Sequence, residues 1–382
     1  MKKTAVVAVA IATLAGTMRR TLLICSLMLL LFFGARTVAL ADSWAYPSRK
    51  VYLSVDHQWR STITPPEGRQ RTPQAVMEHR EQGRWRIVWH RPLVNWVMPV
   101  FVQVSNQGQL ATFDDWPRVG FGPHAVVLYD MNGQPLRQMR LRDFLPMDYI
   151  QGLPTSVSSI WWGGEHRFSD DGRQLRLSVV ETCRSEPFVD DAHKRYIEIV
   201  MDTDTGRVHP PQGPDWERAL SEAKACDAED KLRYPEFVAL YEAPVSPPPN
   251  ADERAWTDYL DAAYWRLEPD AFFDPVSFAM PLRTNRHHVG DLKRLESVLR
   301  TCETTVVIGS PDNEALARTL TEMMTQRPLH CVGAPPVYIA LPDPFFASAA
   351  RAFENSGIEA HQIDTGQPIQ QNPFRKRMYG RP

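Results

Sequence analysis

The sequence predicts an α+β protein: an antiparallel β-rich domain, propeller-like or a sandwich, followed by a small α/β domain with a parallel sheet. Up to about residue 211, runs of alternating apolar and polar residues are separated by polar turns that contain glycine, which is typical of hairpins. After residue 254, helical patterns of about 10–15 residues alternate with short apolar runs rich in valine and isoleucine, which is typical of parallel sheets. A proline-rich segment, 244–253, lies between these two patterns.

The N-terminus has the pattern of an export signal. Lys2-Lys3 and Arg19-Arg20 each precede an apolar run, and the second run ends in the small-x-small sequence Ala39-Leu40-Ala41. We expect a signal peptide over residues 1–41, cleavage after Ala41, and a periplasmic or secreted mature protein; Met18 is a second possible start. The alternative is an uncleaved anchor, but each apolar run is shorter than the about 20 residues that span a bilayer. We therefore expect no stable membrane span after processing.

The charge of the mature chain excludes one class of partner. The full chain of 382 residues has a net charge of −2, and the first 41 residues contain five basic residues and no acidic one, so the mature net charge is −7. A mildly acidic chain lacks the basic surface that binds a phosphate backbone, so nucleic acid is not an expected partner. The length is sufficient for two domains.

Four cysteines remain after processing, and an even number in an exported chain favours disulfides. Four cysteines allow three pairings, and we favour the two that are local in sequence, Cys183–Cys226 and Cys302–Cys331. The chain has no C-x-x-C sequence, which argues against a redox site or a zinc site. We expect no metal centre and no cofactor.

The β-rich domain is predicted over residues 42–212. Glycine supplies the positive φ that tight hairpins require, and it occupies five predicted turns: Gly83, Gly108, Gly133, Gly172 and Gly206. The sequences "FSDDGRQLRL" and "VSNQGQLATF" resemble the F-S-x-D-G-x-x-L hairpin of propeller-type repeats in exported proteins. Longer segments, such as "TFDDWPRVGFGPHAVVLYDMNGQPLR", resemble uncharacterised exported bacterial proteins, a resemblance that implies no activity. A propeller-like stack of hairpins and a β-sandwich both fit.

The stretch "WWGGEHRFSDDGRQLRLSV" places an acid, Glu165, beside a base, His166. A hairpin around Gly172 would set Phe168 opposite Leu175 and His166 opposite Leu177. The period of two then sends Glu165 and His166 to opposite faces, with Glu165 near two arginines and His166 on the apolar face. We expect a buried packing histidine and no acid–base pair.

Three other acidic stretches have structural interpretations. Asp114-Asp115 would end a strand with their side chains on opposite faces. Asp202 to Arg207 resembles a calcium loop, but its glycine stands where a ligand belongs, so we expect a hairpin turn. Asp190 to His193 is interpreted as a polar loop rather than a metal site.

The second half contains a linker, 213–253, and an α/β domain, 254–382. The linker is helical up to about residue 242 and then proline-rich. In the α/β domain we expect helices over 255–267, 289–301, 311–324 and 344–357, and strands over 276–282, 304–310, 336–342 and 358–364.

Polar residues follow the strands of this second domain. In open α/β sheets ligands bind beyond the carboxyl ends of the strands, which makes Arg283, Arg286, His287, Asp312 and Asp343 candidate ligands of a small anion. The alternatives are a polar loop at residues 283–291 and helix capping by the two aspartates. No G-x-G-x-x-G or G-K-[ST] sequence supports nucleotide binding. The basic C-terminus, "RKRMYGRP", is expected to be a solvated end.

Two hypotheses of function follow. The first is an exported, non-catalytic interaction or binding module of the cell envelope, with an envelope protein as partner. The alternative is a periplasmic hydrolase or small-anion-binding protein that uses the strand-end loops of the second domain. No catalytic residue is predicted, and the hydrolase requires the five strand-end side chains to converge.

Overall fold

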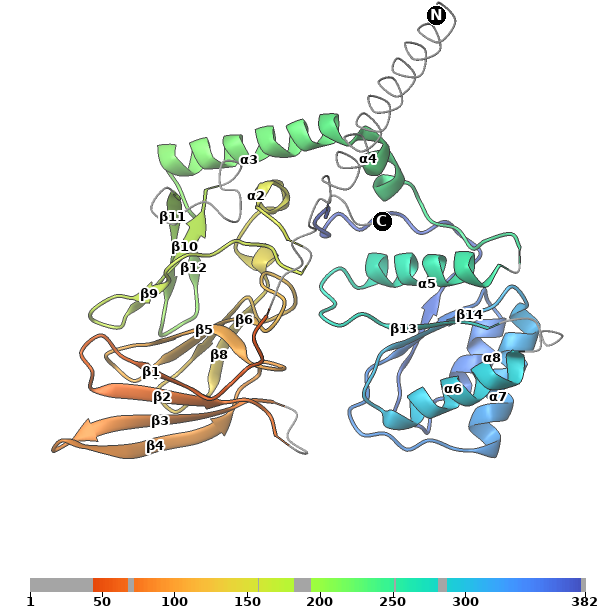
Figure 1. Cartoon of the computed structure of the whole chain (residues 1–382), viewed down its shortest axis with the longest axis horizontal. Helices are drawn as coiled ribbons and strands as arrows, with labels where there is room; N and C mark the ends of the chain where they lie inside the picture. The colour runs from red at the N-terminus through yellow and green to blue at the C-terminus, as the bar shows by residue number, and fades with distance from the viewer. Residues whose placement is uncertain are drawn as a thin grey trace, which may run out of the picture. The chain divides into compact units, whose positions relative to one another are not determined.

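The computed structural model of the chain describes residues 44–67, 72–156, 158–181, 194–250, 252–280 and 287–378 (Figure 1). These residues belong to one compact unit, residues 44–382. In the described part of the chain, none of the helices has the length and apolar character needed to cross a membrane. Several predicted features lie outside the described residues: the signal peptide 1–41 with Met18, Cys183, the loop 190–193, Arg283 and Arg286.

The predicted α+β fold class is confirmed. Three four-stranded antiparallel sheets follow one another in the first half of the chain, and a four-stranded parallel sheet lies in the second half. The antiparallel strands are β1 (Lys50–Leu53), β2 (Trp59–Thr64), β3 (Gln74–Glu81), β4 (Arg84–Pro92), β5 (Pro99–Val104), β6 (Leu110–Asp115), β7 (Val126–Tyr129), β8 (Pro135–Met139), β9 (Arg167–Phe168), β10 (Gln174–Val180), β11 (Tyr196–Asp202) and β12 (Val208–His209).

Each antiparallel sheet is a meander in which consecutive strands are neighbours, in the orders β1-β2-β3-β4, β5-β6-β7-β8 and β12-β11-β10-β9. The first strand of the second sheet, β5, contacts the first strands of the other two sheets, β1 and β9. A sandwich with Greek-key connections would send strands from one sheet to another. Sequential meanders that meet through their first strands match the propeller-like alternative.

The first hairpin of every sheet repeats one local structure. A serine that follows the first strand accepts, through Oγ, the backbone N–H at the start of the second strand, and the third residue after the serine has a positive φ. Two copies contain the predicted turn glycines Gly108 and Gly172; the third has His57 instead, so the glycine pattern did not predict it. The three Oγ bonds are Trp59 N–H to Ser54 (2.9 Å), Gln109 N–H to Ser105 (2.9 Å) and Gln174 N–H to Ser169 (3.0 Å).

The turns also join neighbouring sheets. All five predicted turn glycines have a positive φ, as expected. Gly108 and Gly133, from turns of the second sheet, lie against the rings of Trp59 and Trp89 in the first: an added Cβ would be 2.6 and 2.7 Å from ring carbons. Glycine is required at these positions by the close approach as well as by backbone conformation.

A helical region follows the third sheet, as predicted. α2 (Met147–Gly152), which precedes that sheet, contacts the long helix α3 (Pro214–Arg233). Pro235 begins a separate short helix, α4 (Pro235–Glu242), because proline is tolerated in a first helical turn but not in a helix interior.

The parallel sheet has the strand order β13-β14-β15-β16, and its elements alternate as predicted. Leu260 and Tyr264 of α5 pack on Val307 and Tyr338 on one face, whereas α6, α7 and α8 pack on the face that carries Ile308. The elements of this region are α5 (Glu253–Leu267), β13 (Val276–Ala279), α6 (His288–Thr301), β14 (Val306–Gly309), α7 (Asn313–Gln326), β15 (Val337–Ala340), α8 (Phe345–Arg351) and β16 (Ala360–Ile363).

Candidate functional site

The strand-end residues of the parallel sheet were the predicted ligand site, and three of the five are described. Asp312 is the N-cap of α7 and accepts the Ala315 N–H at 2.9 Å, so its carboxylate has the predicted capping role. Asp343 is not a cap; its Oδ1 accepts Nε2–H of Gln362 at 3.2 Å. His287 is the exposed N-cap residue of α6. Convergence of these side chains with Arg283 and Arg286 stays a prediction.

The strand order of this sheet also bears on a ligand site. In doubly wound sheets the binding crevice opens where the strand order reverses and neighbouring connections go to opposite faces. Here the four strands lie in chain order, and the connecting helices α6, α7 and α8 all pack on one face. The described strands therefore contain no such reversal, and the usual geometric reason for a crevice is missing between them.

A buried polar pair that the sequence analysis did not predict lies at the end of β6. Nδ1 of His124 is 2.7 Å from Oδ2 of Asp115, and both side chains are at most 5% exposed. The other carboxylate oxygen, Oδ1, accepts the Trp96 backbone N–H and Nδ2–H of Asn95, both at 3.0 Å. The edge of the Trp96 ring meets His124, with ring centroids 5.1 Å apart. The carboxylate thus joins the segment between β4 and β5, through Asn95 and Trp96, to the loop that follows β6, through His124.

The neighbouring Asp114 is directed elsewhere, as the alternation of side chains predicted. It leaves the regular strand conformation, with φ of 55°, and accepts the Gly120 N–H at 2.7 Å and the indole N–H of Trp162 at 3.0 Å. Burial raises the pKa of Asp114 to about 8, against the effect of these two donors. The carboxyl groups of Asp114 and Asp115 have different hydrogen-bond partners, so they do not act as a pair.

His166 is a buried packing residue, as expected. Its ring stacks between those of Trp162 and Phe113, with centroids 4.8 and 4.2 Å away, and its Nδ1 accepts the Ser178 N–H at 3.1 Å. Burial lowers the pKa of His166 to about 3, so the ring is neutral near pH 7. Glu165 is exposed, which confirms that the adjacent acid and base lie apart.

The hairpin register around Gly172 is confirmed at Phe168, which pairs with Leu175. The expectation that Glu165 offsets the facing arginines is wrong. Glu198, on the next strand, binds Arg167 at 2.6 Å and Arg176 at 2.9 Å. Glu198 could not be chosen from the sequence, because it lies 31 residues after Arg167 and 22 residues after Arg176.

The disulfide Cys302–Cys331 is confirmed, with a Cα–Cα distance of 5.7 Å. Cys226, on α3, is also disulfide-bonded; its predicted partner Cys183 lies outside the described residues. Among the described residues no three His, Cys, Asp or Glu side chains are grouped so that they could hold a metal ion.

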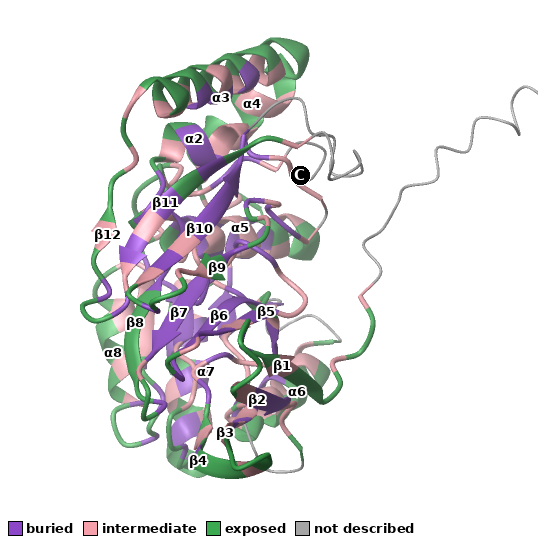
Figure 2. Ribbon diagram, turned by 90° about the vertical axis from the view of Figure 1, so that its left-hand side faces the viewer, coloured by how far each residue is buried: buried purple, intermediate pink, exposed green. Residues whose placement is uncertain are grey.

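The outer face of the first sheet carries several exposed apolar side chains. The opposite face carries Met77 and Trp89 into a buried core, whereas β1 and β4 are largely exposed (Figure 2). On the outer face, Leu53, Arg60, Glu78 and Ile87 form one row across the four strands through successive strand pairs. We call this row, with Val51 of the adjacent row, the outer patch.

The outer patch combines exposed apolar ends with a central ion pair. Leu53 is 47% exposed, Val51 55% and Ile87 67%. Arg60 and Glu78 are joined by two hydrogen bonds of 2.6 and 2.8 Å, and they neutralise one another at the centre of the row. Exposed apolar side chains therefore lie on both sides of a paired, neutral centre, and apolar side chains left in water can be buried against another macromolecule.

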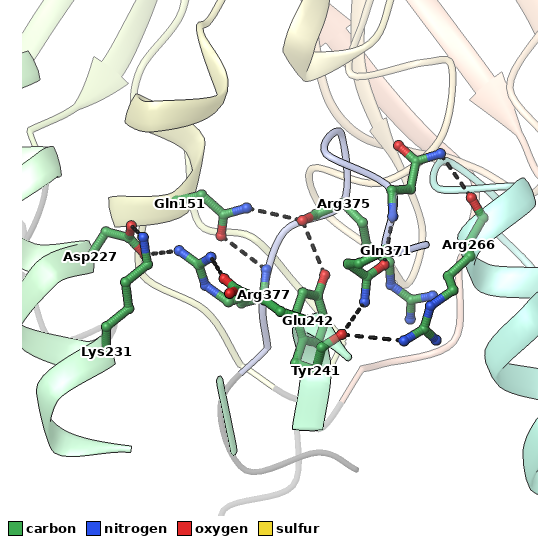
Figure 3. Close-up of polar contacts among 10 residues, drawn as sticks. Gln151, Asp227, Lys231, Tyr241, Glu242, Arg266, Gln371, Arg375 and Arg377 are labelled. Atoms are coloured by element: carbon green, nitrogen blue, oxygen red, sulfur yellow. Dashed lines mark hydrogen bonds and ion pairs between the residues drawn. The ribbon is translucent and has the colours of Figure 1, made fainter. Parts of the chain in front are cut away.

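The C-terminal segment is docked, which corrects the expectation of a solvated end. Ile369 pairs with Val245, and Lys376 and Arg377 are each 7% exposed. The contacts of Arg377 are drawn in Figure 3. Arg377 forms ion pairs with Asp227 of α3 and with Glu242 of α4, the second at 3.1 Å. The basic composition of the C-terminus predicted a frayed end, because the acidic partners of its arginines are not close in sequence. These partners lie on helices about 130–150 residues earlier.

No protein-family model matches the chain, and no curated protein matches it either. The functional conclusions therefore rest on the geometry of the protein itself.

Proposed function

We propose that this protein is exported and acts as a non-catalytic binding protein of the cell envelope, with the outer patch as the surface that holds a protein partner. The observation that carries the proposal is the row of exposed Leu53 and Ile87 on either side of the Arg60–Glu78 pair. Export is supported by the two basic-then-apolar segments and the Ala39-Leu40-Ala41 sequence.

The buried polar groups support a binding role rather than a catalytic one. Asp114 and Asp115 each accept hydrogen bonds that fix loops, and a carboxylate occupied in this way is a structural group. His166 is neutral and enclosed by aromatic rings. The apolar side chains of the outer patch, in contrast, are about half or more exposed, and their burial against a partner would remove apolar surface from water.

The proposal is tested by affinity capture from cell-envelope extracts with three baits. They are the mature wild-type chain, Leu53→Asp, and the matched control Leu136→Asp, which places the same charge at a 40% exposed leucine of β8. A specific partner should be recovered with the wild type and the control and be lost with Leu53→Asp. Recovery of nothing specific, or equal recovery with Leu53→Asp, would contradict the proposed surface.

Export has its own test. In fractionated cells the protein should be found in the periplasmic or secreted fraction, and its N-terminal sequence should begin at Asp42. A protein that stays in the cytoplasm with its first 41 residues attached would refute this part of the proposal.

A further inference from the structure

Two arginine side chains lie over the same tryptophan near the C-terminal segment. The guanidinium carbon of Arg375 is 4.6 Å from the centroid of the Trp265 ring, and that of Arg118 is 5.5 Å from it. The next residue in the chain, Arg266, is 8% exposed. Two guanidinium groups therefore lie over one indole ring, and the third arginine, Arg266, follows that tryptophan in α5. Arg266 and Arg375 are drawn in Figure 3.

Arg266 has hydrogen-bonding capacity that the chain does not use. Its two terminal nitrogens donate to backbone carbonyls of Ala262, Tyr241 and Ala243, at 3.3, 3.3 and 2.9 Å. Its Nε–H is buried and has no acceptor among the described residues. A buried donor without an acceptor is costly, and it indicates either strain or a missing partner.

Two of the three arginines have no carboxylate partner among the described residues. Neither Arg266 nor Arg375 forms an ion pair within the described residues. Arg118 forms an ion pair of 3.9 Å with Asp274, whose side chain is 82% exposed, and it donates a hydrogen bond to the Phe272 carbonyl oxygen. Burial and the neighbouring Arg266 and Arg118 lower the pKa of Arg375 to about 10, although Tyr241 and Asp274 act in the opposite direction. Charges this close are normally accompanied by a counter-charge.

We propose that Arg118, Arg266 and Arg375 form a binding site for a compact oxyanion, a phosphate or a carboxylate group, beside the Trp265 ring. Guanidinium groups bind such anions through paired N–H donors, and the unused Nε–H of Arg266 supplies one donor that is already desolvated. Arg375 is only partly buried, so an anion can reach it from solvent. This site is separate from the outer patch and from the strand-end residues predicted from the sequence.

The side chain of Arg375 can be changed without removing the contacts that dock the C-terminal segment. Those contacts use the backbone: the Arg375 carbonyl accepts the Tyr241 hydroxyl at 3.1 Å and Nε2–H of Gln151 at 2.9 Å (Figure 3). Arg375→Gln is therefore expected to fold and, in chloride, to be at least as stable as the wild type, because it removes one of three mutually repelling charges. The matched control is Arg173→Gln, an exposed arginine of the β9–β10 turn.

The experiment is isothermal titration of the full mature chain with sodium phosphate and with sodium acetate, at an ionic strength held constant with sodium chloride. We expect saturable binding to the wild type and to Arg173→Gln, and binding at least tenfold weaker to Arg375→Gln. The tighter of the two anions identifies the group that the site accepts. Absence of binding to the wild type, or unchanged binding to Arg375→Gln, would overturn the proposal.

A second variant keeps the proposal testable if Arg375→Gln does not fold. Arg375→Lys retains the charge but loses the planar pair of donors. It should bind the anion more weakly than the wild type, whereas equal binding would show that the cluster acts only through its net charge and would refute the site.

Discussion

Replacement of Gly133 by alanine tests whether the turns of one sheet rest on the preceding sheet. A Cβ at this position would lie 2.7 Å from Cδ2 of Trp89 and 2.9 Å from Cε2 and Cε3, about 1 Å closer than a normal carbon–carbon contact. Trp89 is 7% exposed and packs with Ile63 and Met77, so the ring cannot move without disturbing the core. The matched control is Gly83→Ala: both glycines have a positive φ, 72° and 79°, but a Cβ at Gly83 meets no atom within 4 Å.

The two substitutions share one cost and differ in another. Both place an alanine in the left-handed region, which costs about 1 kcal/mol. Only Gly133→Ala adds an overpacking cost of about 1–3 kcal/mol. We expect the free energy of unfolding to fall by about 1 kcal/mol for Gly83→Ala and by about 2–4 kcal/mol for Gly133→Ala.

Equilibrium unfolding in urea, followed by tryptophan fluorescence, measures both values. In a Trp89→Leu background the additional cost of Gly133→Ala should largely disappear, because the ring that causes it is gone. Equal costs for the two glycine variants, or an additional cost that persists without Trp89, would refute the packing of this turn on the first sheet.

Three further predictions concern stability. The double variant Cys302→Ser, Cys331→Ser opens a loop of 29 residues and should lower the free energy of unfolding by about 3.6 kcal/mol, measured in urea; an unchanged midpoint would contradict it. Asp227→Asn weakens one of the two ion pairs of Arg377, which keeps Glu242, and should cost about 1.5–3 kcal/mol; a cost below about 1 kcal/mol would show that the C-terminal segment is held by other contacts. Burial lowers the pKa of Lys376 to about 7 from its ordinary value near 10.4, so the wild type should gain stability as the pH rises from about 7 to 10. Lys376→Met should be more stable than the wild type at pH 7 and should lose this rise; parallel pH profiles would exclude the explanation.

The parts of the fold that depend on local sequence were predictable. The five turn glycines, the Phe168–Leu175 pairing and the alternation of helices and strands follow from backbone conformation and side-chain period, which a short window contains. The disulfide Cys302–Cys331 was also predictable, because both cysteines precede parallel strands and so lie near the same edge of the sheet.

The sites were less predictable, because they join residues that are distant in sequence. The pairing of Asp115 with His124 depends on the path of the intervening loop, and no periodicity or spacing signals it. The first serine turn was missed because His57 adopts the conformation that glycine has in the other two copies. The arginine cluster combines Arg118 with residues near 265 and 375, and the sequence analysis assigned only Arg375, as part of a solvated C-terminal end.

Site-specific photocrosslinking in living cells tests the proposed function most directly. A photoreactive phenylalanine analogue is placed at Leu53 or Ile87 in the outer patch, and at Leu136 as a control of similar exposure. The proposal predicts one discrete crosslinked species of higher mass at both outer-patch positions and none at Leu136. Absence of crosslinks at Leu53 and Ile87, or the same pattern at all three positions, would contradict the conclusion that the outer patch is the partner-binding surface.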